Sequence, residues 1–192
     1  MEFEGKQHAV ANLIAGGPVD DTDRVAVCIK GHINGCESRL EAFMTGWPFG
    51  VTYIVQSTPG DLRHESDAGS KITLLPRIGR GAWSFFSHIL LFEAKGMNVH
   101  DRRLEKQIIF SYDNQEEALR LIKYPGIADI LLTLESDCKL KEMIIKTTAG
   151  ICFTQGVNFK ELDLDMCSAT FNYLAQIAQV MSEIFASPTD AR

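Results

Sequence analysis

The dipeptide Asn34-Gly35 is the feature that most constrains the fold, because this pair strongly favours a two-residue type I′ turn between antiparallel strands. A turn at this pair brings three apolar pairs onto one face of the hairpin: Val25–Met44, Val27–Ala42 and Ile29–Leu40. Lys30 and Glu41 then lie diagonally on the other face, where we expect both side chains to reach water. The turn and the apolar pattern together predict an antiparallel sheet.

More β structure is predicted further along the chain. The segments are 49–56, 71–75, 106–112 and a hairpin at 140–155 that turns at Ala149-Gly150. The first two follow the Asn34-Gly35 hairpin closely in sequence. We therefore expect them to continue that hairpin as one antiparallel meander.

Four helices are predicted from apolar periodicity and start signals. They cover 82–94, 113–123, 125–135 and 160–186. Asp113 with Glu116, and Asn158 with Glu161, are spaced like residues that begin a helix, and Pro125 suits a first helical position. The fold class is therefore α+β, with an antiparallel sheet packed against helices and a long C-terminal helix.

The long C-terminal helix is apolar over an unusually wide arc. One stripe consists of Met166, Thr170, Tyr173, Ile177, Val180 and Ile184, and a second, at heptad spacing, of Leu164, Phe171, Ala178 and Phe185. Two stripes need two surfaces, and the second is the rest of the domain or another subunit. The aromatic segment 82–92 is either core or a docking surface. Trp83, Phe86, Phe171 and Phe185 are therefore the candidate residues of an interaction surface.

Composition predicts an ordinary folded protein. The 192 residues are 45% hydrophobic and 23% charged, which fits one domain over 1–192 with residues 1–23 as an N-terminal extension. The net charge of −6 argues against nucleic-acid binding and against contact with a membrane surface. The acidic start of the chain is unlike a signal peptide, and 82–92 is about half a membrane span. We expect a cytoplasmic protein without a transmembrane segment.

The five cysteines predict free thiols. Their number is odd and no pair forms Cys-x-x-Cys. Cys28, His32 and Cys36 are spaced like zinc ligands, but side chains alternate along a strand, so the two sulfurs should point to opposite sides of the sheet. We therefore predict no metal site, and no pattern in the sequence indicates a cofactor.

A polar cluster is the first choice for a ligand site. His100, Asp101 and Arg103 combine groups that can exchange protons or hold a phosphate. Arg77 and Arg80 stand just before the predicted helix 82–94, whose N-terminus can hold an anion. The alternative interpretation is a solvated turn ahead of the strand at 106–112, with ordinary surface ion pairs.

From Arg24 onward the chain resembles a bacterial domain of unknown function found in soluble hypothetical proteins. The matching features are a strand pair separated by glycine, an apolar helix, the segment 99–110, a helix containing 118–122 and a leucine-rich last helix. Asp101 stands where that group has its first aspartate, whereas Leu104-Glu105 replaces its Phe-Asp. The resemblance implies the α+β architecture and a bacterial source, and no chemistry.

Two hypotheses for function follow. The leading one is a non-catalytic cytoplasmic interaction or assembly module that binds a protein partner or forms a homodimer, because the helices carry excess apolar surface and no known catalytic motif is present. The alternative is a small-molecule or anion-binding protein, or an enzyme, that uses Arg77, Arg80, His100, Asp101 and Arg103. The catalytic residues, the substrate and the pathway stay unknown at this level.

Overall fold

The hairpin expected at Asn34-Gly35 forms strands β2 (Val27–Ile33) and β3 (Cys36–Ala42). Asn34 and Gly35 both have positive φ, at 50° and 82°, as a type I′ turn requires. The predicted register is confirmed where it is described, with Ile29 opposite Leu40 and Val27 opposite Ala42. The third predicted pair, of residues 25 and 44, lies outside the described residues, which are 2–19, 27–42, 50–56, 69–77 and 101–185 of this computed structural model.

The other face of the hairpin differs from the prediction. Glu41 does not reach water: it is only 5% exposed, and its carboxylate forms an ion pair with the guanidinium of Arg39, two residues away on the same strand. Lys30 is half-buried and lies opposite Arg39. A local charge partner therefore stabilises the buried Glu41 carboxylate, which the alternation of side chains alone did not reveal.

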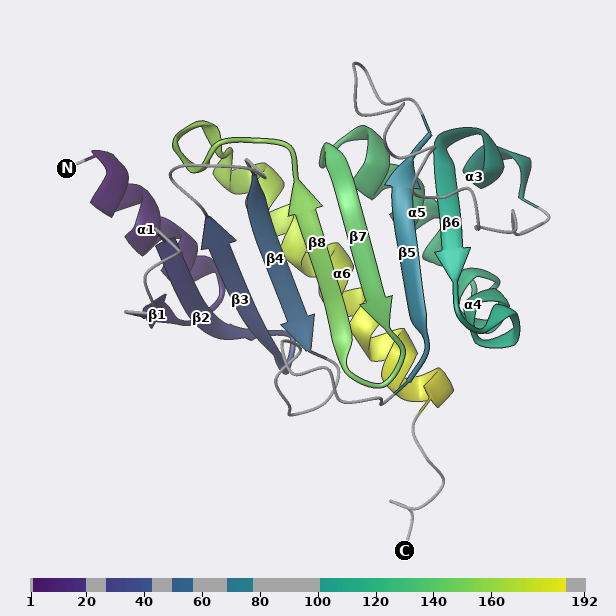
Figure 1. Cartoon of the computed structure of the whole chain (residues 1–192). Helices are drawn as coiled ribbons and strands as arrows, with labels where there is room; N and C mark the ends of the chain where they lie inside the picture. The colour runs from purple at the N-terminus through teal and green to yellow at the C-terminus, as the bar shows by residue number, and fades with distance from the viewer. Residues whose placement is uncertain (1, 20–26, 43–49, 57–68, 78–100, 186–192) are drawn as a thin grey trace, which may run out of the picture.

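The hairpin belongs to an eight-stranded antiparallel sheet (Figure 1). The other strands are β1 (Gly17–Pro18), β4 (Val51–Gln56), β5 (Lys71–Pro76), β6 (Ile108–Tyr112), β7 (Leu140–Lys146) and β8 (Gly150–Gln155). The spatial order is β1-β2-β3-β4-β8-β7-β5-β6. The meander therefore ends at β4. The prediction that 71–75 continues it is wrong, because the β7–β8 hairpin pairs between β4 and β5.

The strands of the inserted hairpin fill the centre of the sheet and supply much of its core. Met143, Ile145, Ile151 and Phe153 each have at most 1% of their surface exposed. The hairpin turns through residues 147–149, and Gly150, where the turn was expected, already pairs with Lys146. Burying so apolar a pair of strands in the middle of a sheet removes more apolar surface from water than an edge position would.

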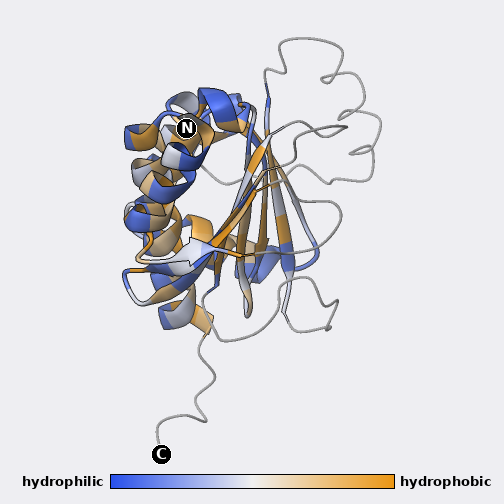
Figure 2. Cartoon of the chain, turned by 90° about the vertical axis from the view of Figure 1, so that its left-hand side faces the viewer, coloured by the Kyte–Doolittle hydropathy of each residue, from blue (hydrophilic) through white to orange (hydrophobic). Residues whose placement is uncertain are grey.

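The described helices cover one face of the sheet (Figure 2). They are α1 (Glu2–Leu13), α3 (Arg102–Gln107), α4 (Gln115–Ile122), α5 (Ile127–Ser136) and α6 (Leu164–Phe185), with a 3-10 turn at Phe159–Glu161. Val10 and Ile14, at and just after the end of α1, are fully buried in the same core as the strands. Residues 2–14 are therefore packed into the fold, and the helix predicted at 82–94 lies outside the described residues.

Helix α4 begins one residue later than its predicted cap implies. The Asn114 side chain, and not that of Asp113, accepts hydrogen bonds from the backbone N–H groups of Glu116 and Glu117, at 3.0 and 3.3 Å. Asp113 is used by the sheet instead, because its carboxylate accepts from the backbone N–H of Lys71. Helix α5 begins after Gly126, whose φ is 87°, two residues beyond the predicted Pro125.

The start signal at Asn158 caps the 3-10 turn and not the long helix. Its side chain accepts from the N–H of Lys160, and the chain is then extended at Leu162, which is 98% buried. Asp163 caps α6, with its carboxylate 2.8 Å from the N–H of Met166. The buried Leu162 interrupts the helix that the sequence pattern predicts from residue 160.

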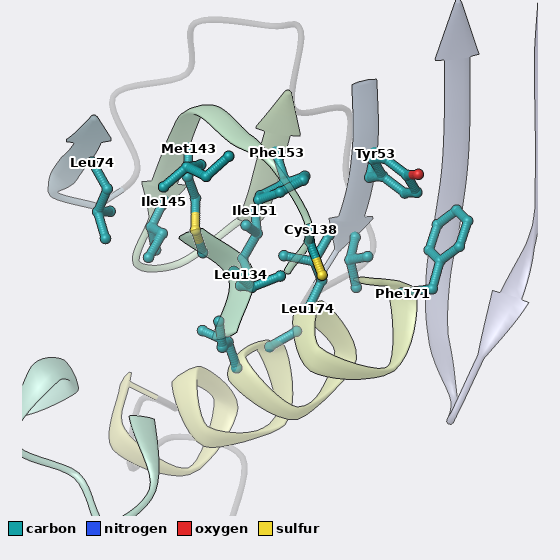
Figure 3. Close-up of a cluster of buried hydrophobic side chains, with 14 of the residues drawn as sticks. Tyr53, Leu74, Leu134, Cys138, Met143, Ile145, Ile151, Phe153, Phe171 and Leu174 are labelled. Atoms are coloured by element: carbon teal, nitrogen blue, oxygen red, sulfur yellow. The ribbon is translucent and has the colours of Figure 1, made fainter. Parts of the chain in front are cut away.

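Helix α6 crosses the inner face of the sheet and packs on it (Figure 3). Its buried positions are Cys167, Thr170, Phe171, Leu174, Ala175, Ile177, Ala178 and Met181. The Phe171 ring lies edge-on to Tyr53, with centroids 5.0 Å apart, and Tyr53 packs in the same way on Phe153 at 5.8 Å. The second predicted stripe of the helix is therefore buried at Phe171 and Ala178 by this chain itself.

Candidate functional site

Strand β6 forms one end of the described sheet, and part of its backbone has no hydrogen-bond partner among the described residues. β6 pairs with β5 on one side only and ends the strand order (Figure 1). The N–H of Asp113 donates to Lys71 and that of Arg77 to Gln107, so the odd-numbered residues of β6 exchange hydrogen bonds with β5. The backbone groups of Ile108, Phe110 and Tyr112 consequently point away from the sheet.

One of these outward groups already has a partner. The N–H of Ile108 donates to the carbonyl of Leu104 at the end of α3. For Phe110 and Tyr112, no backbone hydrogen bond toward the outer side joins another described residue. The strand has the sequence Ile-Ile-Phe-Ser-Tyr, without the charge or proline that usually discourages pairing at an edge.

At the other end of the sheet, the segment that contains β1 packs closely against β2. The chain between Ile14 and Val19 runs along β2, with the N–H of His32 donating to Ile14 and that of Val19 donating to Cys28. The approach is so close that a Cβ on Gly31 would lie 2.1 Å from the Ile14 carbonyl oxygen. At the β6 end, Ile108 and Phe110 are only 1% and 4% exposed, whereas Tyr112 is half-buried, so the accessible part of this edge is at Tyr112.

The predicted ligand cluster is only partly described. Arg80 and His100 lie outside the described residues. Arg77 is exposed at the end of β5, and its backbone N–H bonds the carbonyl of Gln107 at the last turn of α3. Asp101 is at the other end of that helix, about 9 Å along its axis, so the backbone of Arg77 lies at the opposite end of α3 from Asp101.

Asp101 and Arg103 have structural partners. The carboxylate of Asp101 caps α3, accepting from the N–H groups of Arg103 and Leu104 at 2.8 and 3.4 Å. The Arg103 guanidinium donates to Asp101 at 3.1 Å and to Asp129 at 3.0 Å. Its side-chain and backbone hydrogen bonds lower the pKa of Asp101. The predicted turn is thus a capped six-residue helix, and Arg103 lies between two carboxylates.

The candidate interaction residues fall into three groups. Trp83 and Phe86 lie outside the described residues. Phe171 is fully buried in the core, so assigning it to an exposed surface is wrong. Phe185 is half-buried at the end of α6, under the guanidinium of Arg120, which is 5.5 Å from the ring centroid. Arg120, on α4, also donates a hydrogen bond to the carbonyl of Ile184, so this end of α6 is held against α4.

A polar network lies between the sheet and α6. The Tyr53 hydroxyl donates to the side-chain oxygen of Gln155 at 2.7 Å, and both residues are fully buried. Burial, with a further contribution from the neighbouring Cys167 thiol, raises the pKa of Tyr53. A hydroxyl this deep and this weakly acidic stabilises the core and is not placed for chemistry on a solute.

All five cysteines are free, as predicted. The β2–β3 register places Cys28 opposite Glu41 and Cys36 opposite Ile33, on opposite faces of the hairpin. Within the described ranges, no three His, Cys, Asp or Glu side chains converge as metal ligands would. The spacing of Cys28, His32 and Cys36 therefore reflects the hairpin.

Burial makes several of the thiols unreactive. It raises the pKa of Cys152 to about 11 and that of Cys167 to about 12, and it also raises those of Cys36 and Cys138. Since the thiolate is the nucleophile, a thiol of pKa 11 is about one part in a thousand reactive at pH 8.

We therefore predict an order of labelling in the native protein. Iodoacetamide at pH 8 should modify the half-buried Cys36 first and leave Cys167 unmodified until denaturant is added. Peptide mass spectrometry after increasing exposure times measures each site. As a control, all five should react together in denaturant, and rapid native labelling of Cys167 would contradict its assigned environment.

Comparison of the chain with protein-family models, with curated proteins and with solved structures gave no match. Within the described residues, no helix is both long and apolar enough to span a bilayer.

Proposed function

We propose that this protein is a non-catalytic interaction module that binds a partner polypeptide at the Tyr112 end of β6, the last strand of the described sheet. The observation that carries this proposal is the half-buried end of β6 at Tyr112, whose outward backbone groups bond no other described residue. An extended segment that adds to such an edge gains main-chain hydrogen bonds without remodelling the fold.

The titratable groups of the described region support a non-catalytic role. Every thiol with a shifted pKa is shifted upward, away from the reactive form. Asp101, whose pKa is lowered, is held in the cap of α3 by its bonds to Arg103. The pKa of a catalytic group is usually shifted so that the reactive protonation state is populated. Here the thiol pKa values are shifted away from the reactive thiolate, and the lowered pKa of Asp101 results from its role as a helix cap.

Anion binding at Arg103 is disfavoured by the same contacts. Two carboxylates, those of Asp101 and Asp129, already accept from its guanidinium. A phosphate or carboxylate ligand would have to approach both negative charges, which costs several kcal/mol where solvent is excluded and less at this exposed site. We therefore do not propose a second function.

The cellular setting we propose is the cytoplasm of a bacterium. Five unpaired thiols fit a reducing compartment, in which disulfides are rare. The bacterial source follows only from the resemblance described above.

Photo-crosslinking in cells tests the interaction. A photoreactive phenylalanine analogue at the exposed Gln107, beside β6, should give a crosslinked adduct with another polypeptide chain. The same analogue at the exposed Glu37 on β3, away from that edge, is the matched control and should give none. Adducts at neither position, or equally at both, would overturn the proposed docking edge.

A further inference from the structure

We propose that Asn34 is a site of spontaneous modification, at which the backbone nitrogen of Gly35 displaces ammonia from the side-chain amide when the β2–β3 turn opens. The reaction is fastest where glycine follows asparagine, because a bulkier residue hinders the attacking nitrogen. Asn34 is the only asparagine in the sequence that glycine follows, and both residues are exposed. This inference goes beyond the proposed function and does not depend on it.

The chemistry consumes only water. The Gly35 nitrogen forms a bond to Cγ of Asn34, the bond between Cγ and Nδ2 breaks, and ammonia leaves with the proton of the Gly35 N–H. The cyclic imide that results is then hydrolysed by one water molecule at either of its carbonyl carbons. The product is aspartate, or isoaspartate, in which the main chain runs through Cγ.

The native turn holds the reacting atoms apart. Asn34 has a φ of 50°, in the left-handed region, where ψ is about +30 to +60°. With such a ψ, the Gly35 nitrogen lies on the opposite side of the Cα–C bond from Cβ of Asn34, whereas ring closure needs both on the same side. The chain must therefore rotate about this bond before the nitrogen can attack, and that rotation breaks the turn.

Helix α6 holds the turn in its protected form. The Nδ2 of Asn34 donates to Oδ1 of Asn172 at 3.4 Å, and Nε2 of Gln179 donates to the Asn34 carbonyl at 3.2 Å. The second hydrogen bond opposes the rotation directly, because the carbonyl oxygen and the Gly35 nitrogen are bonded to the same carbon and move together. The rate of modification is therefore set by how often α6 releases the turn.

Modification prevents the hairpin from returning to its native form. Aspartate has an oxygen in place of the donor Nδ2, so the hydrogen bond to the Asn172 oxygen is lost. Isoaspartate adds one carbon to the main chain in a two-residue turn whose register places Ile29 opposite Leu40. Both of these side chains are fully buried, so a shift in register would disrupt the core.

The test incubates the purified full-length chain in mildly alkaline buffer, with and without denaturant. Peptide mass spectrometry follows the gain in mass that accompanies replacement of the amide NH2 by OH. In denaturant, Asn34 should be converted before every other asparagine. In the native protein its rate should be at least about tenfold lower, because the turn must first open. Equal rates in the two conditions, or earlier conversion of another asparagine in denaturant, would contradict the proposal.

The variant Gln179→Ala tests the role of α6. It removes one hydrogen bond from the turn, so the native rate should rise about two- to tenfold, which corresponds to the net contribution of one hydrogen bond. Gln176→Ala, on the same helix, is the matched control and should leave the rate unchanged. Both positions are exposed, so the variants should fold. In denaturant all three chains should react equally, and an unchanged native rate for Gln179→Ala would overturn the protection by α6.

Discussion

Replacing Phe171 with alanine is expected to lower the free energy of unfolding by about 3–5 kcal/mol, the range for a large aromatic side chain removed from a packed core. The ring is fully buried and lies edge-on to Tyr53, with centroids 5.0 Å apart. Its loss leaves a cavity between α6 and the sheet and removes an aromatic contact. Denaturant unfolding followed by circular dichroism measures the change. An unchanged dependence of the free energy of unfolding on denaturant concentration would show that the variant exposes the same amount of surface on unfolding.

The matched control is Phe185→Ala, on the same helix. Phe185 is half-buried at the helix end beneath Arg120, so its truncation should cost about 1–2 kcal/mol. Equal losses for the two variants would contradict the assignment of Phe171 to the core. So would a Phe171→Ala protein of unchanged stability.

Local patterns predicted the elements well. The turn at Asn34-Gly35 and the pairs Ile29–Leu40 and Val27–Ala42 are contained within about 20 residues, where turn geometry decides the register. Helix ends were predicted less well, because neighbouring polar residues compete for the same role. Asp113 is drawn into the sheet by the N–H of Lys71, which leaves the cap of α4 to Asn114.

The strand order was beyond local patterns. β4 ends at Gln56 and β7 begins only at Leu140, yet the β7–β8 hairpin separates β4 from β5. Contacts between distant segments depend on which arrangement buries the most apolar surface, and no periodicity records that choice. The candidate edge follows from the same order: the sequence Ile108–Tyr112 predicts a strand, but only its place at the end of the strand order leaves one side of it without a described neighbouring strand.

The short helix α3 was also missed, although its signal is present. Asp101 at the cap, Glu105 in the first turn and Lys106 in the last are the charges that stabilise a helix at each end. Six residues with a single buried side chain, Leu104, show too little periodicity to be distinguished from a turn. The polar residues that suggested a ligand site were those of a helix cap.

Removing one member of the Arg39–Glu41 ion pair should give the second largest loss of stability, after Phe171→Ala. The two side chains are 14% and 7% exposed, so Glu41→Ala leaves the Arg39 charge in a poorly solvated position. Breaking a fully buried pair costs about 3–5 kcal/mol, and the residual exposure of Arg39 reduces our expected value to about 2–4 kcal/mol. Glu37→Ala, at an exposed site on the same strand, should change stability by less than about 0.5 kcal/mol.

The double variant Arg39→Met, Glu41→Leu decides how the pair acts. Replacing both residues removes the two poorly solvated charges together and leaves two apolar side chains on the sheet, so stability should return to within about 1 kcal/mol of the wild type. A double-mutant cycle built from the two single variants and the double variant then gives the coupling energy of the pair. If the double variant were as unstable as the sum of the single losses, the two residues would stabilise the sheet independently, and the cost of Glu41→Ala would come from lost packing.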